Sequence, residues 1–257
     1  MFHNQYFCGV VCFMLCSFAV NAQPLQLCHD AAINPQFQPS IKVADKAVTG
    51  VHNVIAVATL KRLQQPFELH ALPWFRCMNA VSKGEMDGAI GVGWTEQRAA
   101  TMHFPQQADG KPDSTAALFL VDYYVYTHKD SKLDWNGQSF ENVRYGIAAP
   151  QGFVVETMLA QLKVHRPIEV DFTQAMALTV NGRIDGYVQS ELVAAQQLAK
   201  SKNAAQIQQL QPVFFRQPLY LVFSHRAMQR SPEQLRRIWQ SLPAMQSKVS
   251  AASATAG

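Results

Sequence analysis

The sequence predicts an α/β protein of two similar lobes, each a mostly parallel sheet flanked by helices. The first observation is a repeated phrase, G-x-x-D-G followed by an apolar residue, at 84–88 and 182–186. The second is an alternation of short β-prone runs with helical periodicity on both sides of residue 120. The third is a pair of long apolar runs, 117–129 and 218–224, which suit strands that cross between lobes.

Each copy of the repeated phrase follows a helical pattern and precedes a small apolar run. The apolar residues before the two glycines are Trp74, Phe75, Met78 and Val81, and Phe172, Met176 and Val180. A glycine after such a run suits the left-handed position that ends a helix. Each copy therefore predicts a helix, a tight turn and a buried strand. Coincidence is the alternative, because five residues with three identities hold little information.

The first lobe is predicted in the order strand, helix, strand, helix, strand. Alternation or apolar runs favour strands, and spacings of three and four favour helices. Prolines favour loops at 32–37 and 104–114. The predicted strands are 24–30, 66–73 and 88–93, and the predicted helices are 51–64 and 74–83.

The pattern restarts after the long run 117–129. The predicted strands are 144–149, 168–172 and 185–189, and the predicted helices are 153–163, 173–181 and 191–200. A last helix begins after Ser231 with Pro232 and Glu233, a favourable helix start. The predicted division of the chain is 1–22 signal peptide, 23–120 lobe 1, 121–217 lobe 2, 218–247 return to lobe 1 and 248–257 flexible tail.

The N-terminal segment predicts export. Residues 6–20 are almost wholly apolar, and Val20-Asn21-Ala22 resembles a signal-peptidase site. The run is short for a membrane span. Residues 2–5 lack Lys and Arg, which departs from the usual signal pattern, and an uncleaved anchor is the alternative. We expect a soluble periplasmic protein.

Two cysteines remain if the signal is removed. An even number in an exported protein favours a disulfide between Cys28 and Cys77 over two buried thiols. In the chain-entropy model, a loop of about 50 residues gives roughly 4 kcal/mol of stability.

The composition excludes several functional classes. Charged residues make up 16% of the chain, the net charge is +4, and the Lys and Arg residues are scattered, so we expect no nucleic-acid partner. Two cysteines and eight scattered histidines show no metal-ligand spacing, and we predict neither a metal nor a cofactor. Nothing suggests an oligomer, so a monomer is predicted.

The layout resembles the extracellular solute-binding proteins of bacterial ABC importers, specifically family 3, the amino-acid-binding group. The residues that carry the resemblance are PWFRCMNAVSKGEMDGAIGVGWTEQR, 73–98, together with the second G-x-x-D at 182–185. The resemblance covers nearly all of 24–247. It implies a type II periplasmic-binding-protein clamshell that closes on a ligand between two lobes.

The resemblance places the main ligand contact at Arg98. A guanidinium binds a carboxylate through two parallel hydrogen bonds. In the family, the Arg after the Thr that follows the third strand binds the ligand carboxylate, and Thr95 and Arg98 match that spacing. A solvated arginine at a helix start is the alternative.

Further contacts are predicted around Arg98. Gly91 and Gly93 stand where the family offers main-chain groups, although a plain tight turn would also explain them. Asp30 follows the first strand, where a turn former is the alternative. Trp94 is predicted to lie in the cleft, whereas Trp74 and Phe75 are assigned to the helix core.

The second lobe departs from the family at two positions. Gly152 opens the second anion-binding turn, but Phe153 stands where a hydroxyl residue is usual. Ser190 replaces the acid that pairs with the α-ammonium of the ligand, and Glu191 points to the other face of the strand. A small carboxylate ligand is therefore predicted, an amino acid or a related compound.

Three functions are compatible with these residues. The first is capture of a small carboxylate for ABC import, with a membrane permease as partner. The second is a sensing or interaction module of the same fold that acts on a membrane sensor. The third is an enzyme, which we do not predict because no nucleophile and base are paired in the sequence.

Overall fold

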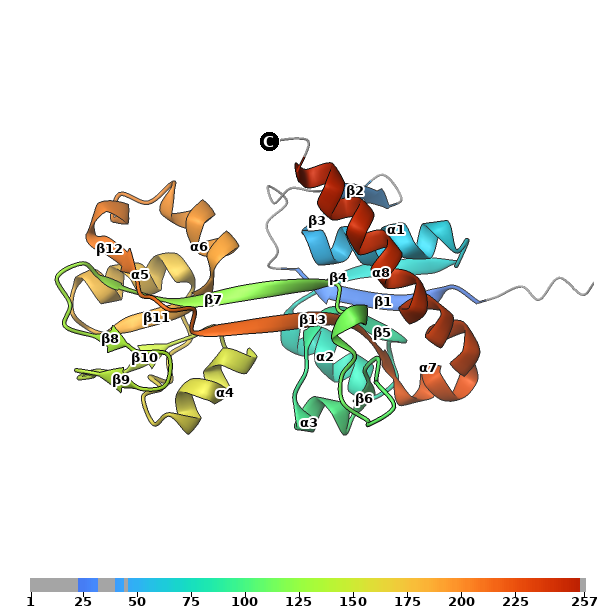
Figure 1. The fold of residues 1–257 in the computed structure, drawn as a ribbon, viewed down its shortest axis with the longest axis horizontal. Coiled ribbons are helices and arrows are strands. Elements are labelled where there is room, and N and C mark those ends of the chain that lie inside the picture. The colour runs from blue at the N-terminus through green and yellow to red at the C-terminus, as the bar shows by residue number, and fades with distance from the viewer. Residues whose placement is uncertain (1–22, 32–39, 44–45, 255–257) are drawn as a thin grey trace, which may run out of the picture.

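The structure is a computed structural model, and it describes residues 23–31, 40–43 and 46–254. The signal predicted for 1–22, the loop predicted for 32–37 and the last three residues of the predicted tail lie outside the described residues. Two bodies of secondary structure are joined by two long strands, β7 (Phe119–His128) and β13 (Phe215–Ser224), which we call the hinge strands (Figure 1).

Lobe 1 has a parallel centre. β1 (Leu25–Asp30) pairs in parallel with β4 (Phe67–Leu72) and β5 (Gly88–Gly93), and β13 closes this part of the sheet in the antiparallel direction. Helices α1 (Val51–Arg62) and α8 (Pro232–Ala254) cover one face, and α2 (Trp74–Ser82) covers the other (Figure 1). The smaller elements are β2 (Ser40–Val43), β3 (Lys46–Thr49), α3 (Glu96–Ala99), β6 (Met102–His103), η1 (Ser114–Ala116) and α7 (His225–Arg230).

Lobe 2 repeats this plan with fewer strands. β10 (Ile147–Ala148) and β11 (Gly186–Ser190) are parallel, and β7 runs antiparallel beside β11. Helix α4 (Val154–Gln161) covers one face, while α5 (Phe172–Val180) and α6 (Glu191–Leu198) cover the other (Figure 1). The remaining elements are β8 (Asp134–Trp135), β9 (Phe140–Glu141), η2 (Ala204–Gln206) and β12 (Ile207–Gln209).

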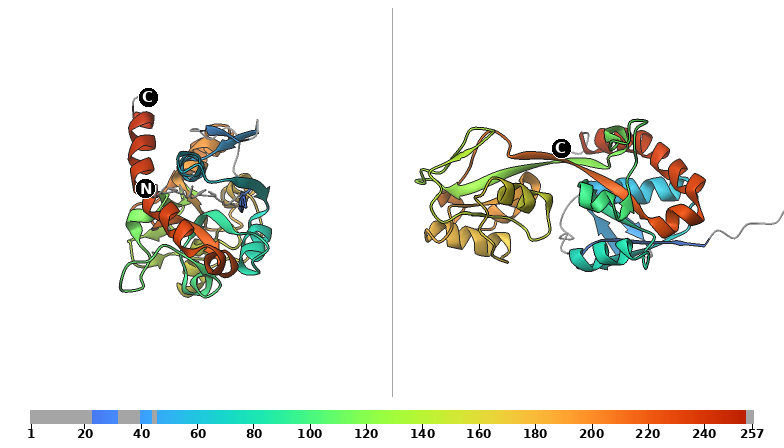
Figure 2. Two further views of the ribbon diagram at one scale, coloured as in Figure 1. Left: turned by 90° about the vertical axis from the view of Figure 1, so that its right-hand side faces the viewer. Right: turned by 90° about the horizontal axis from the view of Figure 1, so that it is seen from below.

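The hydrophobic core divides in the same way. The two clusters of lobe 1 take buried residues from 25–118 and 220–245, whereas the two clusters of lobe 2 lie within 123–214. The hinge strands run between the lobes (Figure 2): β13 contributes Leu221 and Phe223 to the core of lobe 1, and β7 contributes Tyr123 and Val125 to that of lobe 2. The lobe boundaries at residues 120 and 217 stay predictions.

The two G-x-x-D turns have the geometry that the sequence predicts. Gly84 and Gly182 follow α2 and α5 with φ of 72° and 64°, a region where glycine has no Cβ penalty. Asp87 accepts a hydrogen bond from the Gln26 N–H at 2.9 Å. Asp185 accepts from three successive main-chain N–H groups, those of Arg144, Tyr145 and Gly146. Both aspartates are structural.

The disulfide is present. Cys28 in β1 and Cys77 in α2 are bonded and fully buried, so the disulfide joins the first strand of lobe 1 to the helix that covers it.

Two predictions of secondary structure differ from the structure. The strand predicted at 168–172 is absent. Apart from its pairing with β11, β10 bonds Val164 and Arg166, which precede the predicted strand, and Asp171 then caps α5. Its alternation reflects Ile168 and Val170 packing on the α5 cluster without strand partners. The tail predicted to fray from residue 248 continues α8 to Ala254.

Candidate functional site

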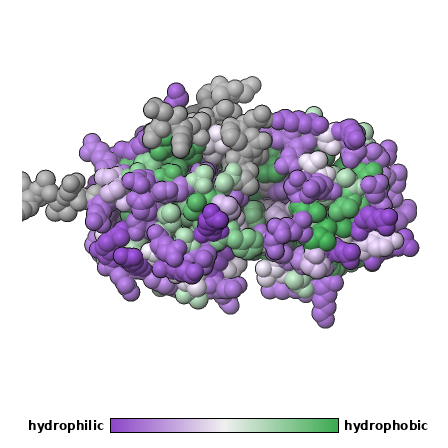
Figure 3. All heavy atoms as spheres, turned by 180° about the vertical axis from the view of Figure 1, so that it is seen from behind, coloured by the Kyte–Doolittle hydropathy of each residue, from purple (hydrophilic) through white to green (hydrophobic). Residues whose placement is uncertain are grey.

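The candidate site lies where the parallel strands of the two lobes end. β1, β4 and β5 end at Asp30, Leu72 and Gly93, and their carboxyl ends meet at one edge because the strands are parallel. In lobe 2, β10 and β11 end at Ala148 and Ser190. Ligands of open α/β sheets bind at such edges. Seen from behind, a notch separates the lobes over part of their length (Figure 3).

Arg98 connects the two edges. Thr95 caps α3 by accepting a hydrogen bond from the Arg98 N–H at 3.1 Å, which sets the direction of this short helix. The Arg98 Nη1 then donates to the Gly93 carbonyl of lobe 1 at 2.7 Å. Its Nη2 donates to the Gly152 carbonyl of lobe 2 at 2.8 Å. The predicted carboxylate-binding residue therefore lies at the contact between lobes.

The Arg98 charge has no carboxylate partner in the part of the chain that the structure describes. Among the described residues, no Asp or Glu lies within 4.0 Å of its guanidinium nitrogens. Its Cζ lies 5.6 Å from the centroid of the Trp74 ring. Burial lowers the pKa of Arg98, whereas the nearby Tyr123 raises it. A partly buried cation bonded only to neutral carbonyls favours an incoming anion.

In lobe 2, the main-chain groups of Gly152, at the start of α4, are already hydrogen-bonded to protein side chains. The Gly152 N–H donates to the Glu156 carboxylate at 2.7 Å, and its carbonyl accepts from Arg98. Glu156 also lies 3.7 Å from His165 Nε2. Phe153 is the N-cap of α4 and makes no side-chain cap bond, as expected for a residue without a hydroxyl. A ligand reaches Gly152 only by displacing one of these protein groups.

Gly91 and Gly93 give room to protein side chains. A Cβ at Gly91, where φ is 87°, would lie 2.9 Å from the His52 ring, and a Cβ at Gly93 would overlap the side-chain amide of Gln217. Gln217 is buried in the hinge strand β13. The close approach predicted for a ligand is therefore made here by His52 and Gln217.

Two imidazole rings belong to this region: His52 lies beside Gly91, and the charge of His29 acts on His52. Burial, and then the charge of His29, lowers the pKa of His52 to about 4. Burial also lowers the pKa of His29, whose Nδ1 lies 3.1 Å from the Asp30 carbonyl. Both rings are therefore neutral at pH 7. Asp30 is partly buried and ends β1, the position at which its ligand contact was predicted.

The first turn of α2 faces lobe 2, which corrects the assignment of Phe75 to the helix core. Phe75 is 56% exposed, and its ring fills the space where a Cβ of Gly152 would stand. Trp74 packs partly on the core of lobe 1, as predicted, and its ring centroid also lies 6.0 Å from that of Phe153. This turn projects past the sheet edge, while Cys77 lies on the buried face of the helix. Trp94 is 37% exposed at the end of β5.

Ser190 ends β11 and is buried. Its N–H donates to the Gln189 side-chain oxygen at 2.8 Å. Glu191 begins α6 and is exposed, so it does not replace the acid that Ser190 lacks.

A cavity of about 410 Å³ adjoins Arg98, and sequence reasoning missed it. It lies between α2, α3 and the first turn of α4. Met78, Asn79 and Ser82 repeat along the face of α2 that borders it, a pattern visible in the sequence. The sequence does not show that a second lobe stands opposite that face.

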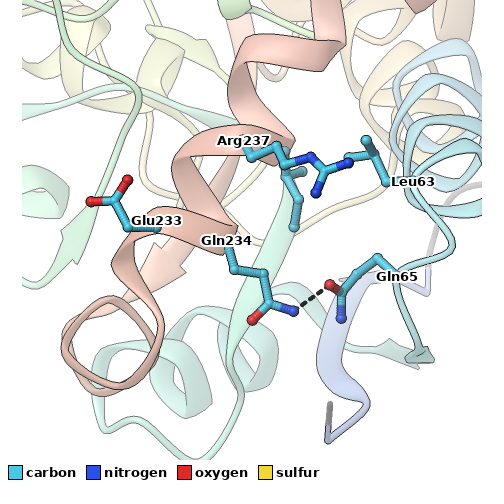
Figure 4. Close-up of a pocket in the computed structure, with 6 residues that line it drawn as sticks. Leu63, Gln65, Glu233, Gln234 and Arg237 are labelled. Carbon is cyan, nitrogen blue, oxygen red and sulfur yellow. Dashed lines mark hydrogen bonds between the residues drawn. The ribbon is translucent and has the colours of Figure 1, made fainter. Parts of the chain in front are cut away.

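A second cavity of about 230 Å³ lies on lobe 1, between the end of α1 and α8. Gln234 and Gln65 bond to each other across it, and Glu233 points away from Arg237 (Figure 4). It has no contact with lobe 2. No group of three or more metal-ligating side chains occurs in the part of the chain that the structure describes, and no helix there could cross a bilayer.

No protein-family model and no curated protein matches this sequence. Solved structures do match. A histidine kinase sensor domain with similarity to periplasmic binding proteins superposes with a TM-score of 0.68 at 15% identity, over 91% of this chain and 95% of that chain. An ancestral arginine-binding protein bound to arginine has a TM-score of 0.63 at 18% identity, over 88% and 96%.

An amino acid ABC transporter substrate-binding protein from Streptococcus pneumoniae, bound to L-arginine, also matches. It has a TM-score of 0.59 at 15% identity, over 90% of both chains. At such identities the likeness extends to the fold. The chain therefore has the two-lobed periplasmic-binding-protein fold that its sequence predicts.

Proposed function

We propose that this chain is an exported solute-binding protein that captures a small carboxylate ligand between its lobes for ABC import. The observation that carries the proposal is Arg98, a partly buried cation at the contact between lobes with only neutral carbonyls as partners. A ligand carboxylate offers this guanidinium a charged partner in place of the Gly152 carbonyl. The amino-acid-binding proteins among the similar structures support this class.

The ligand is an amino acid or a related carboxylate. Ser190 offers no charge to an α-ammonium, and burying an ammonium without a counter-charge is costly. Ligands without that group therefore suit the site better. The other contacts, which remain predictions, are Thr95, Gly91, Gly93, Asp30, Trp94, Gly152 and Ser190.

The cellular setting follows from the N-terminal segment and the disulfide. A cleaved signal at 1–22 delivers the chain to the periplasm, where the Cys28–Cys77 disulfide forms and persists. The protein acts as a monomer, and its partner is a membrane permease. We propose no enzymatic activity, which the arginine-binding and ABC transporter substrate-binding proteins among the similar structures support.

A sensing module is the second candidate. One observation favours it: the similar structure with the TM-score of 0.68 is a histidine kinase sensor domain. In this case closure on the ligand is recognised by a membrane sensor instead of a permease. Ligand capture at Arg98 is common to both functions.

The test is a thermal-shift screen of the purified protein against amino acids, dicarboxylates, amines and small peptides. A ligand at 100 times its dissociation constant adds roughly 2.7 kcal/mol of stability. We expect a carboxylate to stabilise the wild type and not Arg98→Ala. Arg183→Ala, an exposed charge in the Gly182 turn, is the matched control and should keep the shift. A ligand that binds Arg98→Ala equally well would refute the site.

A further inference from the structure

The cavity beside Arg98 combines one cation with an apolar wall. Its 410 Å³ lie within the range of roughly 300–1,000 Å³ for small-molecule sites. It is lined by Trp74, Phe75, Met78, Asn79, Ser82, Thr95, Gln97, Arg98, Thr101, Met102, Gly152, Phe153, Val154 and Thr157. None of these side chains is acidic, so the Arg98 charge is not balanced within the lining.

The apolar wall comes from both lobes. Phe75 and Met78 of α2, with Met102, form the side of lobe 1, and Phe153 stands at the start of α4. The exposed Phe75 ring packs over Gly152 across the lobe contact. Large exposed aromatic surface in a concavity marks a binding site for apolar groups. Thioether side chains adapt their shape to such groups.

Arg98 has donors left for a ligand. Its two hydrogen bonds to carbonyls use two of the five N–H donors that a guanidinium carries. A carboxylate beside these donors would place its attached chain along α2, because Trp74, Phe75 and Met78 border the cavity from there.

We propose that the ligand is a carboxylate with a long apolar or aromatic tail, and that the tail occupies the cavity between α2, α3 and α4. This inference rests on the proposed function, since Arg98 anchors the carboxylate. The lining has no acid to receive an ammonium, so the ligand lacks an α-amino group. Short carboxylates bind to Arg98 and leave the apolar wall exposed to water.

The experiment compares three probes by calorimetry on the purified protein. 4-Phenylbutyrate has the carboxylate and the tail, butyrate lacks the ring, and phenylalanine adds an ammonium. We expect 4-phenylbutyrate to bind about tenfold or more tightly than butyrate, because the ring leaves water. Phenylalanine should bind more weakly than 4-phenylbutyrate.

Two variants test the cavity itself. Phe75→Ala removes part of the wall, and Asn79→Trp fills the cavity from an exposed position of α2. Both should abolish the advantage of 4-phenylbutyrate over butyrate and leave butyrate binding unchanged. Tyr145→Ala, which removes a 52% exposed ring at the opposite end of β10, should change neither.

The outcomes separate the two proposals. If both carboxylates bind equally and depend on Arg98, the proposed function stands and the tail site is refuted. The tail site is likewise refuted if the advantage of 4-phenylbutyrate survives both variants. If phenylalanine binds as tightly as 4-phenylbutyrate, the inference that the ligand lacks an α-amino group is wrong. If no carboxylate binds through Arg98, the proposed function fails and the tail site with it.

Discussion

The two lobes end their central helices with the same turn but use its aspartate differently. In lobe 1, Asp87 divides its oxygens between the Gln26 N–H and Arg230 at the end of α7, at 2.9 and 2.8 Å. In lobe 2, one oxygen of Asp185 accepts all three N–H bonds from the loop before β10. The first aspartate joins distant parts of the chain, whereas the second orders one loop. The same local motif therefore gives the same turn but different tertiary roles.

The cleft shows a second difference. In lobe 1, Arg98 has no carboxylate partner among the described residues, whereas in lobe 2 the Glu156 carboxylate accepts a hydrogen bond from the N–H of Gly152, just before α4. A helix N-terminus attracts anions, and at the N-terminus of α4 this anion is the Glu156 carboxylate of the protein itself. The anion-binding capacity of the cleft is thus concentrated in lobe 1.

The largest expected effect concerns the disulfide, because lobe 2 contains no cysteine. Cys28→Ala/Cys77→Ala should lower the free energy of unfolding by roughly 4 kcal/mol, the chain-entropy value for a loop of about 50 residues. Urea denaturation measures the loss, and hydrogen exchange locates it. We expect amides of lobe 1 to lose protection first. Equal loss in both lobes would show that the lobes unfold as one unit.

Replacing Asp87 or Asp185 by asparagine should lower the free energy of unfolding by different amounts. Asp87→Asn places an NH₂ group against either Arg230 or the Gln26 N–H, so we expect a loss of about 2–3 kcal/mol. Asp185→Asn keeps one oxygen for the three donors and should cost about 1 kcal/mol. Urea denaturation of both variants gives the comparison. A larger loss for Asp185→Asn would contradict the assigned roles.

The partly buried imidazole of His52 in lobe 1 predicts a pH dependence. The pKa of His52 is about 4 in the folded protein and 6.5 as its ordinary value, so between these values the unfolded chain binds more protons. Its contribution to stability is fully present above pH 6.5 and is lost as the pH falls towards 4. His52→Gln should flatten the dependence of the urea midpoint on pH between 7 and 4.5. Gln138→Ser, at an exposed position whose side chain carries no titratable group, is the control and should keep the slope.

The smallest expected effect tests the filled turn of lobe 2. Glu156→Gln keeps an oxygen for the Gly152 N–H but removes a negative charge near Arg98. The dissociation constant of butyrate should fall about two- to fivefold, the size of a helix-terminus charge effect. Calorimetry at low salt measures it, with the exposed Glu169→Gln as control. An unchanged constant would mean that Glu156 and the ligand do not interact.

Much of the fold could be predicted because its signals are local. The spacing of apolar residues along α1 and α2, the glycines after α2 and α5, and the pairing of Cys28 with Cys77 all agree with the structure. The strand predicted at 168–172 failed because alternation records which side chains are buried, not whether the backbone finds a strand partner. The antiparallel pair β2–β3 was missed, and so was β8–β9, although Asn136-Gly137, a common hairpin turn, lies between its two strands. Strands of two residues are too short to show an alternating pattern.

The candidate site could likewise be predicted only where its features are local in the sequence. The sequence by itself determined the turns, the elements and the cation at position 98, because residues within a few positions decide helix ends, turns and strand starts. Only the tertiary structure decided what surrounds that cation: the Gly152 carbonyl, the exposed ring of Phe75 and the Glu156 carboxylate that accepts from the Gly152 N–H. These groups meet because two lobes, each folded around its own core, are placed edge to edge by the hinge strands. No local pattern encodes that placement.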